Sequence, residues 1–154
     1  MVAFSKLWNS YPKDKSPCRS NGSSNFTNQC AIRLGVCLEA AGVNTEKLNV
    51  TRCWYHPKLD GHILRAEELA KVLSSVPGVG RVQKYKKGPE GFYAIENRTG
   101  IVLFQNYWGS GSQGDHIDLW NRKMLTRDLR LSGRYQPGDG GLYEKANIWF
   151  WPVA

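Results

Sequence analysis

The segment 30–41 carries apolar side chains on most of its helical surface. A helix of this kind is stable only when it lies inside a core, because almost no side of it can face water. Gly42 suits the end of the helix, and Thr27 or Asn28 is a candidate cap at its start. With 154 residues, the chain has the length of one domain, 1–154, built around this helix.

The hydrophobic patterns on either side of this helix change from helical to extended along the chain. A short amphipathic helix is predicted over 4–11, a polar loop over 12–28 and a second helix over 62–74. Beyond Pro77 the apolar residues alternate or form short runs, which predicts strands over 81–85, 100–105, 116–120 and 148–151, with a helical turn over 92–96. Helices followed by strands indicate an α+β fold, with the core helix packed against an antiparallel sheet.

Composition excludes several classes of protein. Hydrophobic residues make up 41% of the chain, which is enough for a core without metals or a dense disulfide framework. No apolar stretch reaches the roughly 18 residues of a membrane helix, so we predict no membrane insertion. The first residues are too mixed for a signal peptide, which predicts synthesis in the cytoplasm without a cleaved signal. The net charge of +8 favours an acidic partner, but the basic residues are scattered and no nucleic-acid-reading motif is present.

The cysteines are Cys18, Cys30, Cys37 and Cys53. None of their spacings is the C-x-x-C of a zinc or thioredoxin motif, so we predict no metal and no cofactor. Cys37 falls inside the core helix, where a thiol is usually inert packing. A helix end and a loop separate it from Cys53, so a Cys37–Cys53 disulfide is possible.

Cys30 differs from the other cysteines because it begins the core helix directly after a polar loop. Free backbone N–H groups at a helix start favour a thiolate and can also hold an oxyanion. A base is needed as well, and His116 is the best candidate, since it lies in an apolar strand after the glycine-rich loop 109–114. His56 and His62 compete for this role, but their turn and helix-start positions favour surface or capping functions.

A third polar group should orient the imidazole of the base. The candidates are Asp118, Asn121 and Asp128. Asp118 shares a strand face with His116, although residues two apart rarely give a collinear hydrogen bond to a ring nitrogen. Asn121 falls in the following turn. Asp128 would lie on the adjoining strand or turn, and we favour it, followed by Asp118.

Three segments of the chain resemble a known family. They are Asn28-Gln29-Cys30-Ala31-Ile32-Arg33-Leu34, His116-Ile117-Asp118-Leu119-Trp120-Asn121 and Ile148-Trp149-Phe150-Trp151-Pro152. In this order they resemble the nucleophile segment, base segment and aromatic C-terminus of the fourth family of type VI secretion amidase effectors.

The resemblance implies an NlpC/P60-type, papain-like fold, with Cys30 as nucleophile, His116 as base and Asp128 as the third catalytic residue. It implies cleavage of peptidoglycan stem peptides between D-glutamate and meso-diaminopimelate. It further implies secretion by the type VI machinery, action in the periplasm of a rival bacterium, and a cognate immunity protein. Within the matching segments, Gln29 and Trp120 are predicted to contact the substrate.

Other functions remain open at the level of the sequence. A cysteine peptidase or transglutaminase-like enzyme of different specificity could use the same residues. The chain has six Trp and seven Tyr, which would also suit a non-catalytic wall- or glycan-binding module. The positive charge and three histidines would suit a basic nuclease-like toxin.

Overall fold

A computed structural model describes residues 1–12, 16–108, 114–126 and 145–154 of the chain. The helices are α1 (Phe4–Ser10), α2 (Cys30–Ala40), α3 (Ala66–Val72) and α4 (Glu90–Ile95), with the 3-10 turns η1 (Thr45–Lys47), η2 (Lys58–Asp60) and η3 (Leu73–Ser75). The strands are β1 (Arg19–Ser20), β2 (Ser23–Ser24), β3 (Gln83–Tyr85), β4 (Thr99–Trp108), β5 (Gly114–Asn121), β6 (Met124–Leu125) and β7 (Asn147–Pro152). None of the helices in these described ranges has the length and apolar character needed to cross a membrane.

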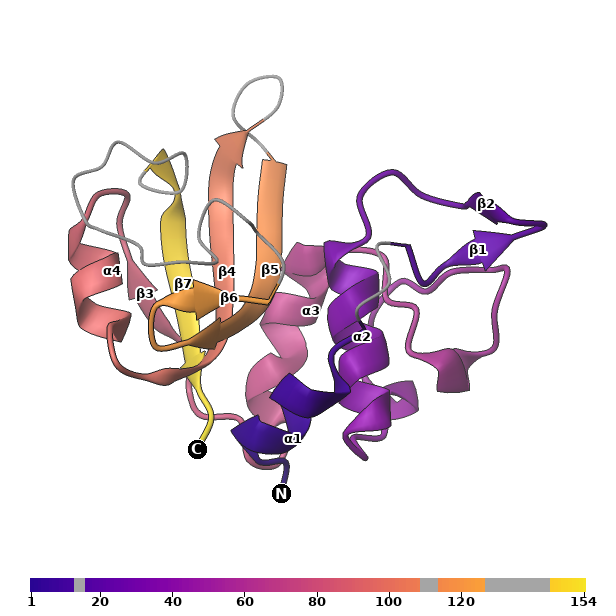
Figure 1. The fold of residues 1–154 in the computed structure, drawn as a ribbon, viewed down its shortest axis with the longest axis horizontal. Coiled ribbons are helices and arrows are strands. Elements are labelled where there is room, and N and C mark those ends of the chain that lie inside the picture. Colours follow the sequence, from indigo (N-terminus) through magenta and orange to yellow (C-terminus); the bar gives the residue numbers. More distant parts are fainter. Residues whose placement is uncertain (13–15, 109–113, 127–144) are drawn as a thin grey trace.

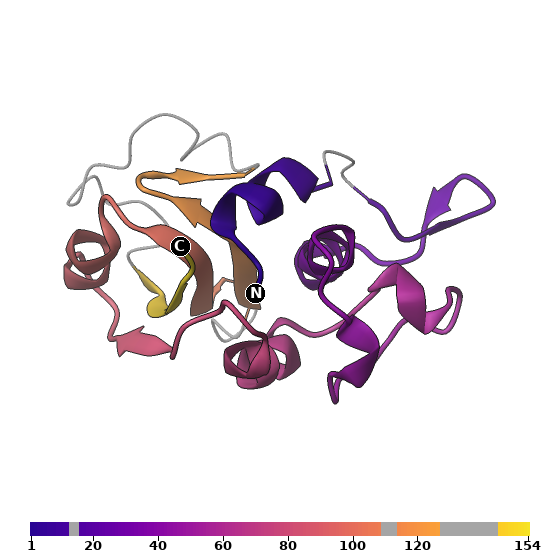
Figure 2. The same ribbon diagram turned by 90° about the horizontal axis from the view of Figure 1, so that it is seen from below.

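Five of the strands form one antiparallel sheet in the order β3-β7-β4-β5-β6. Figure 1 shows α4 at the outer side of this sheet, while α2, α3 and the small β1–β2 hairpin lie beyond β5. Seen from below, α1 and α3 lie on opposite sides of the β5 edge, with α2 farther out (Figure 2). The predicted α+β organisation, a core helix beside an antiparallel sheet, is confirmed.

Alternating side chains of the central strands enter two separate apolar clusters. Leu103, Ile117 and Trp151 pack with α1, α2 and α3 in one cluster. The neighbouring positions, including Phe104 and Trp120, form the other cluster with α4. Both faces of the sheet are therefore covered, which explains the short continuous apolar runs in the sequence.

Trp120 belongs to the second cluster and is only 1% exposed. Its indole N–H donates to the backbone oxygen of Ile95 at 3.0 Å, and its ring meets Phe92 edge-on. A buried tryptophan usually finds such a hydrogen-bond partner. This core position argues against the predicted contact of Trp120 with substrate.

Helix α2 is buried as predicted, with Leu34, Cys37 and Leu38 completely inside the core. Its Gly35 meets the backbone of Gly61 so closely that a Cβ atom on either residue would collide with the other. Gly61 also has a positive φ of 71°, a conformation that glycine adopts readily. The chain after η2 is thereby held directly against α2.

The predicted helix over 62–74 begins later than expected, at Ala66. The residues before it are extended instead, because Ile63 forms an antiparallel bridge with Arg52 and the Cys53 N–H donates to the His62 oxygen at 2.9 Å. Pairing between distant segments has overridden the local helical pattern. The hairpin of β1 and β2 and the short strand β6 were also not predicted.

Candidate active site

Cys30 is the first residue of α2, where the sequence pattern placed it. Gln29 occupies the N-cap position, one residue later than the predicted caps, and its side chain makes no capping bond. Asn28, one of the predicted caps, supplies a capping hydrogen bond instead, because its Oδ1 accepts the Cys30 N–H at 3.2 Å. The thiol therefore lies at the positive end of the helix dipole, which favours an anion.

The imidazole of His116 hydrogen-bonds to the Cys30 thiol, although the two residues are far apart in the sequence. His116 lies on β5 opposite Phe104 of β4, and α2 packs against β5. The backbone N–H of Ile117 also donates to the Cys30 sulfur. The structure thus brings together the two residues that the sequence paired as nucleophile and base.

Asp118 makes a hydrogen bond to the ring of His116, which its spacing in the sequence did not favour. Its Oδ2 lies 3.1 Å from His116 Nε2, although the two residues are only two apart on the same strand. The other carboxylate oxygen accepts the Leu119 N–H at 2.7 Å and the hydroxyl of Thr126. Asp118 is completely buried, and these bonds fix its carboxylate against the ring. With Nε2 engaged by Asp118, Nδ1 remains for the thiol.

The electrostatics of this cluster favour a thiolate beside an imidazolium. Burial raises the pKa of Cys30, but the hydrogen bond and positive charge of His116, the Ile117 N–H and the charge of Arg33 together lower it below the usual value of 9.0. Burial lowers the pKa of His116, but the bonds to Asp118 and Cys30 and the charges of these two groups raise it from 6.5 to about 10. The cysteine is therefore ionised at a pH where the histidine is still protonated.

Two further groups around Asp118 had no signal in the sequence. Thr126 follows β6 and donates its hydroxyl to the carboxylate. Tyr11, at the end of α1, is buried nearby, and both burial and the negative charge of Asp118 raise the pKa of its phenol. Their roles depend on contacts between α1, β5 and β6, which no local pattern reveals.

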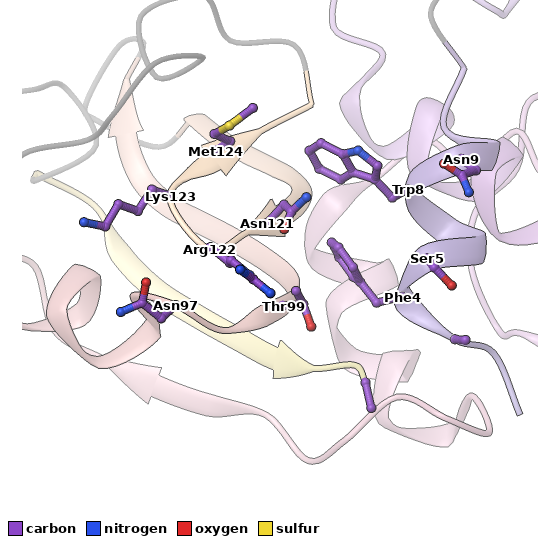
Figure 3. Close-up of a pocket in the computed structure, with 12 residues that line it drawn as sticks. Phe4, Ser5, Trp8, Asn9, Asn97, Thr99, Asn121, Arg122, Lys123 and Met124 are labelled. Carbon is purple, nitrogen blue, oxygen red and sulfur yellow. The ribbon is translucent and has the colours of Figure 1, made fainter.

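The remaining predicted site residues lie elsewhere. Asp128 falls outside the described residues. Asn121 ends β5 and faces a groove of about 1130 Å³, which is lined by Phe4 and Trp8 of α1 and by the turn that leads to Met124 (Figure 3). Neither Cys30 nor His116 lines this groove, so it is separate from the thiol–imidazole pair.

Gln29 is 1% exposed and directs its side chain into the preceding loop. Its Oε1 accepts the Cys18 N–H at 2.9 Å, and its Nε2 donates to the Cys18 oxygen at 3.0 Å. The same Nε2 contacts Ser24 and Phe26. These contacts fix the residue that precedes Cys30 and argue against the predicted direct contact of Gln29 with substrate.

His56 and His62 do not approach the Cys30 thiol but meet Cys18 and Cys53 in a second cluster. His62 is buried, so the surface or capping role predicted for it is wrong. The possible Cys37–Cys53 disulfide is also wrong, because both cysteines are free thiols. The Cys37 thiol donates to the Leu7 oxygen at 3.2 Å, whereas the Cys53 sulfur lies 3.3 Å from that of Cys18.

Comparison with known proteins shows the family to which the chain belongs. The sequence model of type VI secretion system (T6SS) amidase effector protein 4, Tae4, matches residues 26–151. The chain belongs to this family. The Tae4 family consists of type VI secretion effectors that act as peptidoglycan amidases. No match was found among curated protein sequences.

Solved structures of Tae4 proteins share the fold along the whole chain. The effector from the Tae4/Tai4 effector–immunity system of Salmonella typhimurium superposes with a TM-score of 0.68 at 17% identity, covering 100% of this chain and 99% of that one. Tae4 from Enterobacter cloacae superposes with a TM-score of 0.62 at 20% identity, covering 100% of this chain and 98% of the other. The shared fold confirms the expected NlpC/P60-type, papain-like architecture.

Proposed function

We propose that this Tae4 protein is a cysteine amidase in which Cys30 is the nucleophile and His116 is the general base and acid. The observation that carries the proposal is the contact of the Cys30 thiol, at the start of α2, with an imidazole that is itself held by Asp118 at 3.1 Å. Nucleophile, base and orienting group in mutual hydrogen-bond contact are the requirement for this chemistry.

The reaction begins from the Cys30 thiolate and the His116 imidazolium. The thiolate attacks the amide carbonyl, and the carbonyl oxygen becomes an oxyanion near the backbone N–H groups of the first turn of α2. When the carbon–nitrogen bond breaks, His116 gives its proton to the leaving amine and a thioester remains on Cys30. Neutral His116 then takes a proton from water, which hydrolyses the thioester and releases the carboxylate product and the thiol.

Asp118 supports each proton transfer without touching the substrate. Its buried carboxylate holds the tautomer and orientation of the His116 ring and stabilises the positive charge that the ring carries. The Leu119 N–H and the Thr126 hydroxyl keep this carboxylate in place. Asp128, which the family resemblance assigns to the third catalytic position, is a second candidate for the orienting role.

We assign the substrate as the stem peptide of peptidoglycan, cut between D-glutamate and meso-diaminopimelate, which makes the enzyme a DL-endopeptidase. Membership of the Tae4 family and the resemblance of the nucleophile and base segments support this bond. The net charge of +8 supports it as well, because stem peptides are rich in carboxylates and attract a basic enzyme.

The place of action and the partner follow from the same assignment. A wall amidase of a type VI system would act in the periplasm of the rival cell after delivery by the secretion machinery. The producing cell then needs protection, and the solved Tae4–Tai4 complexes of Salmonella typhimurium and Enterobacter cloacae support a cognate immunity protein as partner of this chain. The surface nearest the Cys30 thiol is the region we expect such a protein to cover.

Mass analysis of Gram-negative muropeptides tests the assignment. The wild-type protein should release a fragment cut between D-glutamate and meso-diaminopimelate, Cys30→Ala should not, and Cys37→Ala should retain the activity as a control for loss of a buried thiol. Cleavage at another bond would keep the thiol mechanism and overturn the substrate. A folded wild-type protein that leaves both muropeptides and intact sacculi uncut would contradict the proposed activity.

A further inference from the structure

A second group of thiols and imidazoles lies outside the proposed catalytic machinery. Cys18, Cys53, His56 and His62 come from separate loop segments, yet their potential ligand atoms all lie within 4.8 Å of one another. Cys18 precedes β1, while the other three residues flank the turn η2. We propose that these four side chains bind one zinc ion and that the ion fixes the loops that hold the start of α2.

The two sulfur–nitrogen distances within the cluster match the edges of a tetrahedron around zinc, and the sulfur–sulfur distance is somewhat shorter than such an edge. The Cys18 and Cys53 sulfurs are 3.3 Å apart, and His56 Nδ1 lies 3.6 Å from the first and 3.5 Å from the second. With Zn–S bonds of about 2.3 Å and Zn–N bonds of about 2.0 Å at tetrahedral angles, the sulfur–sulfur edge is about 3.8 Å and each sulfur–nitrogen edge about 3.5 Å. A small movement of one sulfur completes this face of the tetrahedron.

His62 supplies the fourth candidate ligand, since its ligand atom lies within 4.8 Å of those of the other three residues. Its ring lies beside that of His56, with centroids 4.2 Å apart and the planes tilted by 38°, and the residue is only 7% exposed. Its Nδ1 is buried without a hydrogen-bond partner in the described part of the chain. An unpaired buried nitrogen is costly, and a metal ion among the four side chains can take up such a lone pair.

The surroundings suit thiolate ligands. The backbone N–H of Tyr55 donates to the Cys53 sulfur at 3.3 Å, and the Asn25 side-chain amide donates to the Cys18 sulfur at 3.4 Å. Such outer hydrogen bonds orient metal-bound sulfur and stabilise its negative charge. Two thiolates and two neutral imidazoles balance the charge of one Zn²⁺, so the complete site is neutral and can be buried.

Four protein ligands leave no open coordination position, which is typical of a structural zinc site rather than a catalytic one. Cys18 and Cys53 pack with Ile32 of α2 in one small apolar cluster. Gln29 binds the Cys18 backbone on both its N–H and its oxygen, and the next residue in the chain is Cys30. The ion would therefore position the nucleophile through this loop, without touching the reaction.

The search for C-x-x-C spacings could not detect this site in the sequence. Cys53-x-x-His56 followed by His62 has the short spacings of a metal-binding segment, but the fourth ligand, Cys18, lies 35 residues before Cys53. A search for paired C-x-x-C motifs does not find a set of this kind.

Metal analysis of the full chain tests the proposal independently of enzyme activity. The experiment uses the Cys30→Ala variant, so that the Cys30 thiol cannot bind metal. This variant is purified under reducing conditions and without chelators. We expect about one zinc per chain by elemental mass spectrometry. Replacement by Co²⁺ should give the intense visible bands of tetrahedral cobalt and the ultraviolet charge-transfer bands of two thiolates. A strong chelator should lower the melting temperature by at least about 10 °C.

Variants separate this site from the other thiols. Cys53→Ser and His62→Ala in the same background should lose the zinc, whereas the matched variant Cys37→Ser should keep it. Because an unfolded variant would also lose metal, cobalt binding by the folded Cys30→Ala protein is the deciding measurement. Absence of stoichiometric metal and of thiolate–cobalt bands there would overturn the proposal. A Cys18–Cys53 disulfide in the reduced-purified protein, or zinc retained by Cys53→Ser, would also overturn it.

Discussion

The molecule contains two thiol–imidazole groups, and their neighbours give them opposite chemistry. At Cys30 the thiol meets one imidazole, a helix N-terminus and a backbone N–H, while a buried carboxylate lies behind the ring. At Cys18 and Cys53 two thiols meet two imidazoles, and the pKa of Cys18 is raised to about 11 by burial, partly offset by Asn25 and reinforced by Cys53. The first arrangement separates charge within the pair, whereas the second offers two thiols, which lose their protons when a cation binds, and two neutral imidazoles. Residue type alone therefore does not distinguish a nucleophile from a ligand.

The largest expected effect comes from the two cysteines of α2. Cys30→Ala should reduce amidase activity by roughly 10⁴-fold or more, because no other group can form the thioester. Cys37→Ala should leave kcat unchanged, since burial and the nearby Asp118 raise the pKa of the Cys37 thiol to about 12 and keep it protonated. Initial rates on a purified muropeptide, corrected for the folded fraction, measure both. Equal losses in the two variants would contradict the assignment of the nucleophile.

The second effect concerns the buried carboxylate of Asp118, which is hydrogen-bonded to the ring of His116. Asp118→Asn should lower kcat by about 10²-fold or more, since the neutral amide cannot stabilise the imidazolium or enforce its tautomer. Because the bond to Asp118 raises the pKa of His116, the alkaline limb of the kcat/KM profile should also move to lower pH in this variant. Asp128→Asn is the matched comparison. A larger loss in Asp128→Asn, with the alkaline limb of Asp118→Asn unmoved, would transfer the orienting role to Asp128.

The ionisation of Cys30 should depend on His116. Burial raises the pKa of the Cys30 thiol, but His116, the Ile117 N–H and the charge of Arg33 together bring it below 9.0, so the thiolate should form at lower pH than an ordinary thiol. In His116→Ala only the Ile117 N–H and the charge of Arg33 still oppose the effect of burial on the Cys30 pKa. We therefore expect the thiolate fraction near neutral pH to fall at least about tenfold, the effect of one pKa unit. The ultraviolet absorbance of the thiolate against pH, with the titration of Cys30→Ala subtracted, gives this pKa. An unchanged pKa of Cys30 in His116→Ala would contradict the proposed ion pair.

The smallest effect is expected at Gln29, which joins the two groups. Gln29→Ala leaves the Cys18 N–H and oxygen without their partner, which should cost about 1–3 kcal/mol of unfolding free energy. Displacement of the adjacent Cys30 should lower kcat a few-fold with little change in KM. Thermal unfolding measures the loss of stability, and steady-state kinetics measure kcat and KM. A raised KM with unchanged stability would instead restore the direct substrate contact predicted from the sequence.

Much of the fold could be predicted from local patterns. The buried helix over 30–41, the four longer strands and the α+β order were visible because hydrophobic periodicity depends only on neighbouring residues. The start of α3 was not, because it depends on the Arg52–Ile63 bridge outside the helix itself. The β1–β2 hairpin was not predicted either, because its pairs Arg19–Ser24 and Ser20–Ser23 lie in a polar segment without hydrophobic alternation. Local propensity gives way where a tertiary hydrogen bond competes with it.

The sequence by itself determined which thiol begins a helix and which histidine follows in a strand, since both facts are local and periodic. It also determined the family, through segments that match in order. Only the tertiary structure decided that Asp118 holds the ring of His116 and that Trp120 and Gln29 are internal. The proximity of Cys18 to Cys53, His56 and His62 was likewise visible only in the tertiary structure. Hydrogen bonds and metal sites require atoms within a few ångströms in three dimensions, and distance along a chain does not fix that separation.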